Sequence, residues 1–383
     1  MTISRDILSV GVYDPDLTLF EGQYRVSGMA YNSYLIPDER IAVMDTVDAH
    51  VGDAWQANLD RALNGREPDY LVVQHMEPDH SANIAAFLTR YPRATVVASA
   101  QAFTMMKQFF GVDYADRRLV VKEGDVLPLG RHTLRFIAAP MVHWPEVMVT
   151  YDEYDHVLFS ADGFGKFGSC DTVADWADEA RRYYIGIVGK YGAQVQALLK
   201  KASTLDIRAI CPLHGPVLTE NLGYYLGLYD KWSSYAPEES GVVIAYASVY
   251  GNTRRAAEVL AEELRARGET VSLYDLTCDD IHAAIAAAFR YDRLVLASVT
   301  YNGDIFPLMR SYISGLVERN FRSRRIGLME NGSWAPLAAK VMRSLLDSCK
   351  DLSFTDTVVR VRSALSAESA AQVQALAEEM QER

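Results

Sequence analysis

The sequence predicts an α/β protein with two domains, a sandwich of mixed strands with helices outside and a doubly wound parallel sheet of five strands. Short apolar strands dominate the first half of the chain, and helical periodicity appears between them and later. From residue 242 onward, strands and helices alternate regularly, which is typical of a parallel sheet. A polar stretch at 232–241, which contains Pro and Gly, separates the two patterns and indicates a linker. We therefore expect domains at residues 1–236 and 241–383.

Length, composition and charge exclude several classes of protein. The 383 residues are enough for two domains with full hydrophobic cores, and the apolar content of 49% is that of a globular protein. The net charge of −12 argues against nucleic acid as a partner, and a solvated turn explains the short basic run at 322–325. The start of the chain lacks a signal sequence, and no stretch reaches the ~18 apolar residues of a membrane span. We expect a cytoplasmic protein that does not associate with membranes.

The elements predicted for the first domain fit an αββα sandwich. Strands at 33–36 and 41–45 flank the polar turn at 37–40. The apolar run 70–74 predicts a further strand, and the periodicity at 175–187 predicts a helix. Mixed strands with helices outside them are typical of this architecture.

Four candidate metal ligands follow the strand at 70–74 within six positions, in the segment His75-Met76-Glu77-Pro78-Asp79-His80. If the chain continues extended, His75, Glu77 and Asp79 point to one side, because side chains alternate along a strand. His80 then turns toward a second point. One short loop could therefore serve two metal ions.

Three more residues with ligand side chains follow apolar runs and precede chain-breaking residues. They are His143 before Trp144-Pro145, Asp162 before Gly163, and His214 before Gly215. Together with the loop they make a set of four histidines and three carboxylates. We expect ordinary structural roles for the remaining histidines, which lack such neighbours: His50, His132, His156 and His282.

Four cysteines, at positions 170, 211, 278 and 349, are too far apart for any C-x-x-C pair. A fused rubredoxin module needs two such pairs to bind its own iron, so we expect none in this chain. Cys211 lies close to His214, but we expect it to pack in a strand as a small apolar side chain.

The second domain contains predicted strands and helices in strict alternation. In a doubly wound sheet, ligands bind at the carboxyl ends of the strands, near the point where the strand order reverses. The loops after the first, third and fourth strands are therefore the candidate binding loops. The predicted strands are at 242–247, 270–275, 293–298, 325–329 and 354–361, and the predicted helices at 254–267, 279–289, 307–318, 335–346 and 367–382.

The first of these loops, Ser248-Val249-Tyr250-Gly251-Asn252-Thr253, offers hydroxyl and backbone N–H groups to a phosphate at the start of a helix. It lacks the Gly-Lys of a nucleoside triphosphate loop, and the domain has no G-x-G-x-x-G for a dinucleotide. An ordinary helix capped by Asn252 or Thr253 is the alternative.

The other two loops place aromatic side chains at the same edge of the sheet. Tyr301 lies in the loop at 298–303, and Trp334 in the loop at 330–334. Either residue alone would more often pack or shield the protein from solvent. Together with the loop at 248–253, in this order and spacing, they indicate one binding site.

The order of these motifs resembles that of the flavodiiron protein family. The loop H-x-E-x-D-H, followed by His, Asp and His before Gly-Pro, resembles the metallo-β-lactamase-type domain of these proteins. The loop at 248–253 resembles the flavodoxin phosphate loop. The resemblance covers essentially the full length and is to the minimal two-domain class. It implies a metallo-β-lactamase-like sandwich followed by a flavodoxin-like sheet.

The resemblance also implies a di-iron site. In the zinc hydrolases of the same superfamily the loop is usually H-x-H-x-D-H, and Glu77 replaces the second histidine here. A hard anionic oxygen favours iron, which cycles through a trivalent state, over zinc. The family's pattern assigns one iron to His75, Glu77 and His143, the other to Asp79, His80 and His214, and the bridge to Asp162.

For the second half, the resemblance implies bound flavin mononucleotide (FMN), with its phosphate on the first loop and its ring between the other two. The residues concerned are Ser248, Val249, Tyr250, Gly251, Asn252, Thr253, Thr300, Tyr301, Asn302, Gly303, Asn331, Gly332, Ser333 and Trp334.

Members of this family reduce dioxygen to water, nitric oxide to nitrous oxide, or both, and protect anaerobes. The resemblance therefore implies an oxidoreductase that takes electrons from an external donor such as rubredoxin. It also implies a head-to-tail homodimer or a dimer of such dimers. Two alternatives are a zinc-dependent hydrolase with a flavodoxin appendage and a non-enzymatic gas or redox sensor. Metal content separates the first from a reductase, and steady turnover separates the second.

Two positions depart from the family pattern. Many members have Phe-His-Gly near the N-terminus, with the histidine close to the di-iron pocket, where this chain has Phe20-Glu21-Gly22. The third flavin loop often has a Ser-Tyr-Gly-Trp type of sequence, where this chain has Asn331-Gly332-Ser333-Trp334. The first departure bears on the choice of gas, and the second on the redox properties of the flavin.

Overall fold

Two large β-sheets form the first structural unit, which comprises residues 1–184 and 191–230. The structure is a computed structural model, and it describes residue 4 and residues 6–381. The first sheet has the strand order β1-β6-β7-β8-β9-β10, and the second β11-β12-β13-β14-β15. These strands are β1 (Leu8–Ser9), β6 (Tyr34–Pro37), β7 (Ile41–Met44), β8 (Tyr70–Val72), β9 (Thr95–Ala98), β10 (Arg118–Val120), β11 (Val126–Pro128), β12 (Thr133–Ala138), β13 (Met148–Asp152), β14 (Val157–Phe159) and β15 (Ala209–Cys211).

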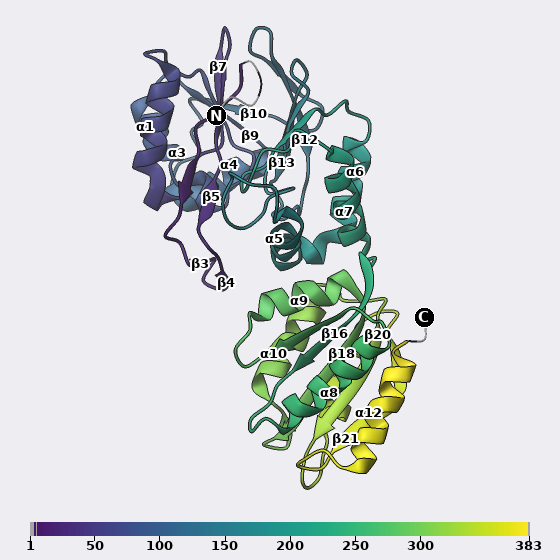
Figure 1. The fold of residues 1–383 in the computed structure, drawn as a ribbon. Coiled ribbons are helices and arrows are strands. Elements are labelled where there is room, and N and C mark those ends of the chain that lie inside the picture. The colour runs from purple at the N-terminus through teal and green to yellow at the C-terminus, as the bar shows by residue number, and fades with distance from the viewer. Residues whose placement is uncertain (1–3, 5, 382–383) are drawn as a thin grey trace. The chain divides into compact units, whose positions relative to one another are not determined.

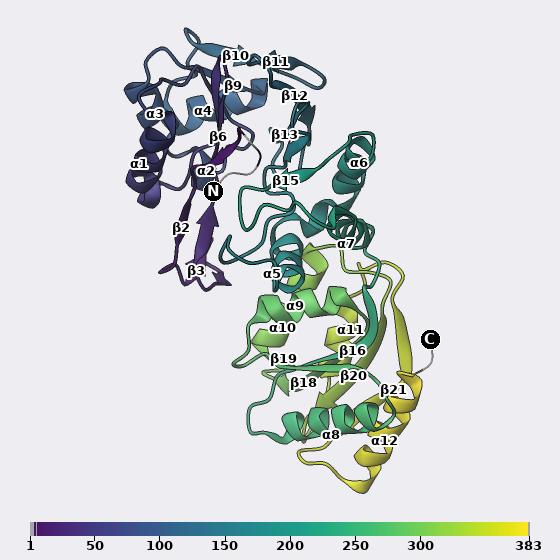
Figure 2. The ribbon, with the colours of Figure 1, turned by 45° about the horizontal axis from the view of Figure 1, so that its top comes forward.

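The core of this unit lies between the two sheets, and helices cover their outer faces. Met44 and Val72 of the first sheet belong to the same buried apolar cluster as Phe136 and Phe159 of the second. In Figures 1 and 2, α1 and α3 lie along the first sheet, and α6 and α7 along the second. The predicted αββα sandwich is therefore confirmed. The helices are α1 (Gly52–Leu63), α2 (Pro78–Ser81), α3 (Ile84–Arg90), α4 (Ala100–Phe110), α5 (Trp176–Tyr183), α6 (Gly192–Ala202) and α7 (Leu222–Ser234).

Parallel strand pairs position the loops that carry the predicted metal ligands. β7, β8 and β9 are parallel neighbours, and so are β14 and β15. The carboxyl ends of parallel strands meet at one edge of a sheet, so the loops that follow β8, β14 and β15 leave from such edges. Shorter elements complete the unit: β2 (Val12–Asp14) pairs with β5 (Met29–Tyr31), β3 (Leu19–Phe20) pairs with β4 (Tyr24–Arg25), and a 3₁₀ turn occurs at Ala49–Val51. A π-helical turn at Tyr184–Val188 and a 3₁₀ turn at Gly189–Tyr191 contain residues 185–190, which belong to the second unit.

The second unit, residues 185–190 and 231–383, is a parallel sheet of order β17-β16-β18-β20-β21. This is the flavodoxin-like strand order, which reverses between β16 and β18, the first and third strands. The predicted doubly wound sheet is therefore confirmed. α8 and α12 share one apolar cluster on one face, while α9, α10 and α11 lie on the other (Figure 2). The elements are β16 (Glu239–Tyr246), β17 (Val271–Asp275), β18 (Tyr291–Tyr301), β19 (Asp304–Ile305, antiparallel to β18), β20 (Arg325–Asn331), β21 (Ser353–Val361), α8 (Asn252–Ala266), α9 (Ile281–Arg290), α10 (Pro307–Glu318), α11 (Ala338–Leu345) and α12 (Ala367–Glu379).

The segment before β16 is more regular than the sequence predicts. α7 continues to Ser234 and β16 begins at Glu239, so the linker predicted at 232–241 is wrong in its extent. Trp232 is buried, and its indole N–H donates a hydrogen bond of 2.6 Å to Glu238. This contact explains why a polar stretch with Pro and Gly stays structured. In the part of the chain that the structure describes, no helix is long and apolar enough to cross a membrane.

Candidate functional site

Pro78 divides the four ligands of the loop after β8 into two pairs. His75 and Glu77 precede it in irregular chain, whereas Pro78 begins the helical turn α2, which contains Asp79 and His80. The expectation that Asp79 continues an extended alternation is therefore wrong. Proline has a fixed φ and favours the first position of a helix, so the chain turns there. The turn directs Asp79 and His80 to a second group of ligands.

The first group consists of His75, Glu77 and His143. One carboxylate oxygen of Glu77 lies 3.2 Å from Nε2 of His75 and 3.0 Å from Nε2 of His143. His75 is fully buried, and His143 is only 9% exposed. With Asp162, the ligand atoms of this group lie within 4.8 Å of one another, which is the spacing that one metal ion needs.

The second group consists of Asp79, His80 and His214. Oδ2 of Asp79 lies 3.3 Å from Nε2 of His80 and 3.2 Å from Nε2 of His214. The two Nε2 atoms are 3.0 Å apart, and all three side chains are buried. Two imidazole nitrogen atoms that face each other share at most one proton, so this arrangement favours a cation as their common partner.

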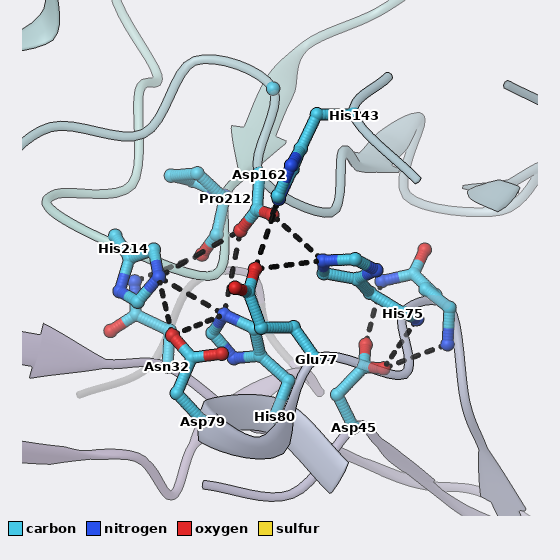
Figure 3. A network of polar contacts seen from close by, with 12 residues as sticks. Asn32, Asp45, His75, Glu77, Asp79, His80, His143, Asp162, Pro212 and His214 are labelled. Atoms are coloured by element: carbon cyan, nitrogen blue, oxygen red, sulfur yellow. Dashed lines mark hydrogen bonds and ion pairs between the residues drawn. The ribbon is translucent and has the colours of Figure 1, made fainter. Parts of the chain in front are cut away.

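Asp162 connects the two groups, as Figure 3 shows. Its Oδ2 lies 3.2 Å from the Nε2 atoms of both His75 and His143. Its Oδ1 lies 3.4 Å from Nε2 of His80 and 3.7 Å from Nε2 of His214. One carboxylate thus presents one oxygen to each group, which is the arrangement of a bridging ligand.

The buried carboxylates of this site lack hydrogen-bond donors. Neither oxygen of Asp79 or Asp162 accepts a hydrogen bond of normal geometry, although both side chains are buried. An uncompensated buried charge is strongly unfavourable. Metal ions would remove this cost, and a mixed set of imidazole and carboxylate ligands suits transition metals. The donor set therefore fits two metal ions, one in each group.

The ionisation of the site also favours cations. Burial opposes the ionisation of Asp162, but the nearby imidazoles of His75 and His143 hold its pKa well below the ordinary value. Burial also opposes protonation of His143, but Asp162 and Glu77 outweigh it and raise the pKa of His143 to about 9. Protons on imidazoles thus balance the carboxylates when no metal is bound. A metal ion would displace these protons.

Hydrogen bonds orient two of the histidines toward the centre. Nδ1–H of His214 donates to the carbonyl oxygen of Ala30 at 2.7 Å, and Nδ1–H of His75 donates to Glu146 at 2.9 Å. Because Nδ1 carries the proton, Nε2 is left to bind metal. Glu146 also accepts from the backbone N–H of Met76 at 2.8 Å. The sequence pattern did not identify Glu146, although a carboxylate three residues after a predicted ligand was an available signal.

Glu146→Gln should weaken metal binding about 10- to 100-fold, the effect usual for partners of ligating histidines. Glutamine keeps the shape of the side chain but loses the charge that orients and polarises His75. Competition with a chelator measures the dissociation constant. Glu153→Gln is the matched control, because Glu153 is partly exposed and pairs with Arg135. Equal metal affinities of the two variants would show that Glu146 has no such role.

Glu21, one of the two departures from the family pattern, lies within electrostatic reach of the metal groups. It occupies the turn between β3 and β4 with a φ of +48°. Its side chain is exposed, yet partial desolvation, followed by repulsion from Glu77, raises its pKa to about 7. A carboxylate here therefore responds to the charge of the site.

The structure corrects the expectation that His132 lacks ligand-type neighbours. Its buried Nδ1 lies 3.0 Å from Oδ2 of Asp152, and Asp155 completes a third group of possible metal ligands. The same Oδ2 accepts a hydrogen bond from the backbone N–H of Asp155 at 2.9 Å. Asp152 therefore stabilises the turn that follows β13. No sequence signal pointed to this group, because β12 and β13 bring the residues together only in the folded sheet.

The predicted binding loops of the second unit line one cavity of about 630 Å³. It lies at the carboxyl ends of β16, β18 and β20, where the strand order reverses. Every FMN-contact residue that the resemblance implies lines it except Gly251, whose φ of +87° shapes the loop instead. The sequence pattern missed four lining residues: Val299, Ala335, Leu337 and Ser363.

The start of α8 can bind an anion. Its N-cap is Gly251, and no side chain caps the helix, so the alternative of a cap at Asn252 or Thr253 is wrong. The N–H groups of the first turn are therefore available to a phosphate. Oγ1 of Thr253 is buried without a hydrogen-bond partner, and Oγ of Ser248 accepts from Gly251 at 3.1 Å. These groups fit the phosphate of a flavin nucleotide.

The rim of this cavity carries two almost fully exposed aromatic side chains. Tyr250 is 92% exposed and Trp334 is 83% exposed. Exposed aromatic groups at a cavity indicate a surface that a planar ligand or a partner covers.

Thr300, which also lines the cavity, has a second role, because its Oγ1 accepts hydrogen bonds from the backbone N–H groups of Leu337 and Ala338 at 3.0 and 3.2 Å. It thus holds the start of α11 as well as lining the cavity.

Comparisons with known proteins match both units in this order. Residues 29–215 match the model of the ODP family of β-lactamases, and residues 243–352 match that of a flavodoxin domain. The flavodiiron protein from Giardia intestinalis superposes with a TM-score of 0.90 at 25% identity, over 99% of this chain and 96% of that one. The chain belongs to the flavodiiron protein family.

Two further relatives of this flavodiiron protein carry names that describe an activity. The structure of rubredoxin oxygen:oxidoreductase from the anaerobe Desulfovibrio gigas superposes with a TM-score of 0.92 at 25% identity, over 99% of this chain and 97% of that one. The nitric oxide reductase of Moorella thermoacetica is 29% identical over 363 residues, which are 91% of this chain and 90% of that one. The chain spans about half the length of the diflavin flavoproteins of Synechocystis sp. that it also matches.

Proposed function

We propose that this chain reduces dioxygen to water, nitric oxide to nitrous oxide, or both, with two irons and FMN as cofactors and rubredoxin or a similar protein as electron donor. The observation that carries the proposal is Asp162, whose two oxygen atoms face two separate groups of ligands. The names of the relatives from Desulfovibrio gigas and Moorella thermoacetica support both reactions.

The residues that would hold the irons are the seven that surround this bridge. Glu77 supports iron over zinc, because it puts an anionic oxygen where the related zinc hydrolases usually have imidazole. When bound, the irons supply reducing electrons and open coordination positions, and FMN supplies the electrons that restore them. The proposed ligands are His75, Glu77, Asp79, His80, His143, Asp162 and His214.

Aromatic side chains pack against two of the imidazoles. The rings of Phe20 and Tyr183 each lie 5.5 Å from the ring of His214, and Trp144 lies 5.2 Å from His75, with edge contacts in each case. Phe20 and Tyr183 are themselves buried. These contacts and the hydrogen bond from Nδ1–H keep the Nε2 atom of each ring directed at the centre. The site is thus organised before any cofactor binds.

The number of electrons agrees with this function. Reduction of dioxygen to two waters takes four electrons and four protons, and coupling of two nitric oxide molecules to nitrous oxide and water takes two of each. Two ferrous ions and one fully reduced FMN hold four electrons. One pair of irons and one FMN therefore hold enough electrons for either reaction.

Parallel turnover of both gases with reduced rubredoxin, on anaerobically purified protein, tests the proposal. We expect steady consumption of at least one gas by protein that contains iron and releasable FMN. Stoichiometric zinc with hydrolytic activity and no FMN would contradict the proposal and favour the hydrolase. Oxidation of the iron without steady turnover would favour the sensor.

Ser248→Ala combined with Thr253→Ala should weaken FMN binding and leave the iron content unchanged. The double variant removes two hydroxyls at the start of α8, one of which is buried without a partner, and the proposed iron ligands lie in the other unit. Flavin and iron per chain are measured after desalting. Ser311→Ala, an exposed serine of α10, is the control. Loss of iron together with FMN would mean that the variant is misfolded.

We also propose that the chain forms a head-to-tail homodimer. A domain of ~240 residues has a radius of gyration of ~18 Å, so cofactors in two domains of one chain need not be adjacent. A two-fold axis that places the flavin domain of one chain against the iron domain of the other would bring them together. The exposure of Tyr250 and Trp334 supports a partner at the cavity rim. The domain limits 1–236 and 241–383 and the cytoplasmic location stay predictions.

A further inference from the structure

A small cavity lies in the first unit beside two chain segments that carry proposed metal ligands. It lies among β12, β13, β14 and α6 and has a volume of about 20 Å³. Two of its lining residues are sequence neighbours of proposed ligands, because Val142 precedes His143 and Gly163 follows Asp162. The cavity therefore adjoins the chain segments that carry the bridge and one ligand of the first group.

The cavity is apolar. Apart from glycine, most of its lining is aliphatic, and the two polar side chains that line it are already hydrogen-bonded. Oγ of Ser160 donates to the carbonyl oxygen of Gly163 at 2.6 Å, and the hydroxyl oxygen of Tyr229 accepts from the backbone N–H of Phe164. A buried water molecule needs two to four polar partners, so these walls do not favour water.

Size and position select the occupant. A cavity of about 20 Å³ has room for less than two water-sized spheres, and therefore for one molecule of about two heavy atoms. On its α6 side, Leu198, Leu199 and Leu205 are partly exposed, whereas Val149 on the strand side is buried. An apolar molecule could therefore enter beside α6 and reach the side next to the ligands. A diatomic gas fits these limits, because it is small and loses few hydrogen bonds on leaving water.

We propose that this cavity binds the diatomic gas substrate and delivers it to the metal centre. The inference rests on the proposed function and adds a substrate-binding site to it. Dioxygen and nitric oxide share the chemistry that the cavity recognises, since both are small and weakly polar. The cavity raises the local concentration of gas next to the metals while its walls keep bulk water out.

Val149→Ile tests the proposal, because one added methylene group about fills the cavity. The Michaelis constants for dioxygen and for nitric oxide should rise about threefold or more, with kcat at saturating gas, iron and FMN unchanged. Val126→Ile makes the same change at an exposed position of β11 and should behave as wild type. A rise for one gas alone identifies that gas as the one delivered through the cavity. Unchanged Michaelis constants for both gases would overturn the proposal.

A second variant and a measurement without turnover test the proposal even if Val149→Ile does not fold. Val195→Thr keeps the shape of a buried lining residue of α6 but offers water a hydroxyl, so it should raise the same Michaelis constants. Crystals of the oxidised holoprotein pressurised with dioxygen should show one diatomic molecule in the cavity of the wild type and none in Val149→Ile. An empty cavity in the wild type would overturn gas binding. If dioxygen binds in these crystals but neither gas is turned over, the proposed function fails and the delivery step fails with it.

Discussion

Asp162→Asn should lower the rate of gas reduction at least about a hundredfold and release much of the bound iron. Asparagine has the same shape, so the variant removes charge and little else. Two cations held close together repel each other strongly unless an anion lies between them, and Asp162 is the residue that faces both groups. Steady-state turnover and elemental analysis of anaerobically purified protein measure the two effects.

Asp152→Asn is the matched control for this variant. Asp152 is also a buried aspartate of the first unit, but it pairs with His132 away from the proposed ligands. We expect this change to reduce stability while the folded protein keeps its iron and its turnover. If Asp162→Asn behaves in the same way, Asp162 does not bridge the metals.

Mixing two inactive variants should restore about a quarter of the wild-type activity if the proposed head-to-tail dimer exists. One variant, Asp162→Asn, keeps the flavin site, and the other, Ser248→Ala with Thr253→Ala, keeps the iron site. Random re-association of equal amounts gives about half heterodimers, and each contains one intact flavin site opposite one intact iron site. Activity is measured before and after chain exchange.

Transfer within one chain gives a different result in the same experiment. Each chain of the heterodimer then has one broken site, so no activity returns. Chain exchange is verified with two differently tagged variants, and two copies of the same variant, mixed and exchanged, provide the baseline. Absence of recovery despite proven exchange would rule out electron transfer between subunits.

The fold of the second unit was predictable because its central strands β16, β18 and β20 are buried on both faces. Such strands are continuous apolar runs, and the helices between them have a clear periodicity. The errors lie at element ends. The helix predicted from residue 335 begins at Ala338, because Ala335 has a φ of +43° and Pro336 follows it. A pattern of apolar residues does not contain this backbone information.

The proposed metal ligands were predictable for a related reason. His143, Asp162 and His214 all follow strand residues that the sequence marks clearly, and strand ends place side chains at one edge of a sheet. The bend at Pro78 was not foreseen, although it decides which ligands belong together. Glu146 was not foreseen either, because the residue acts on the metal only through His75.

A reductive titration of the anaerobic, fully oxidised protein tests the central claim most directly, since it counts both cofactors in one measurement. Two ferric ions take up one electron each and FMN takes up two, so we predict about four electrons per chain. The flavin absorbance reports where in the titration its two electrons enter. An uptake of two electrons, all of them into the flavin, would mean that the metals are not redox active and would contradict the di-iron assignment.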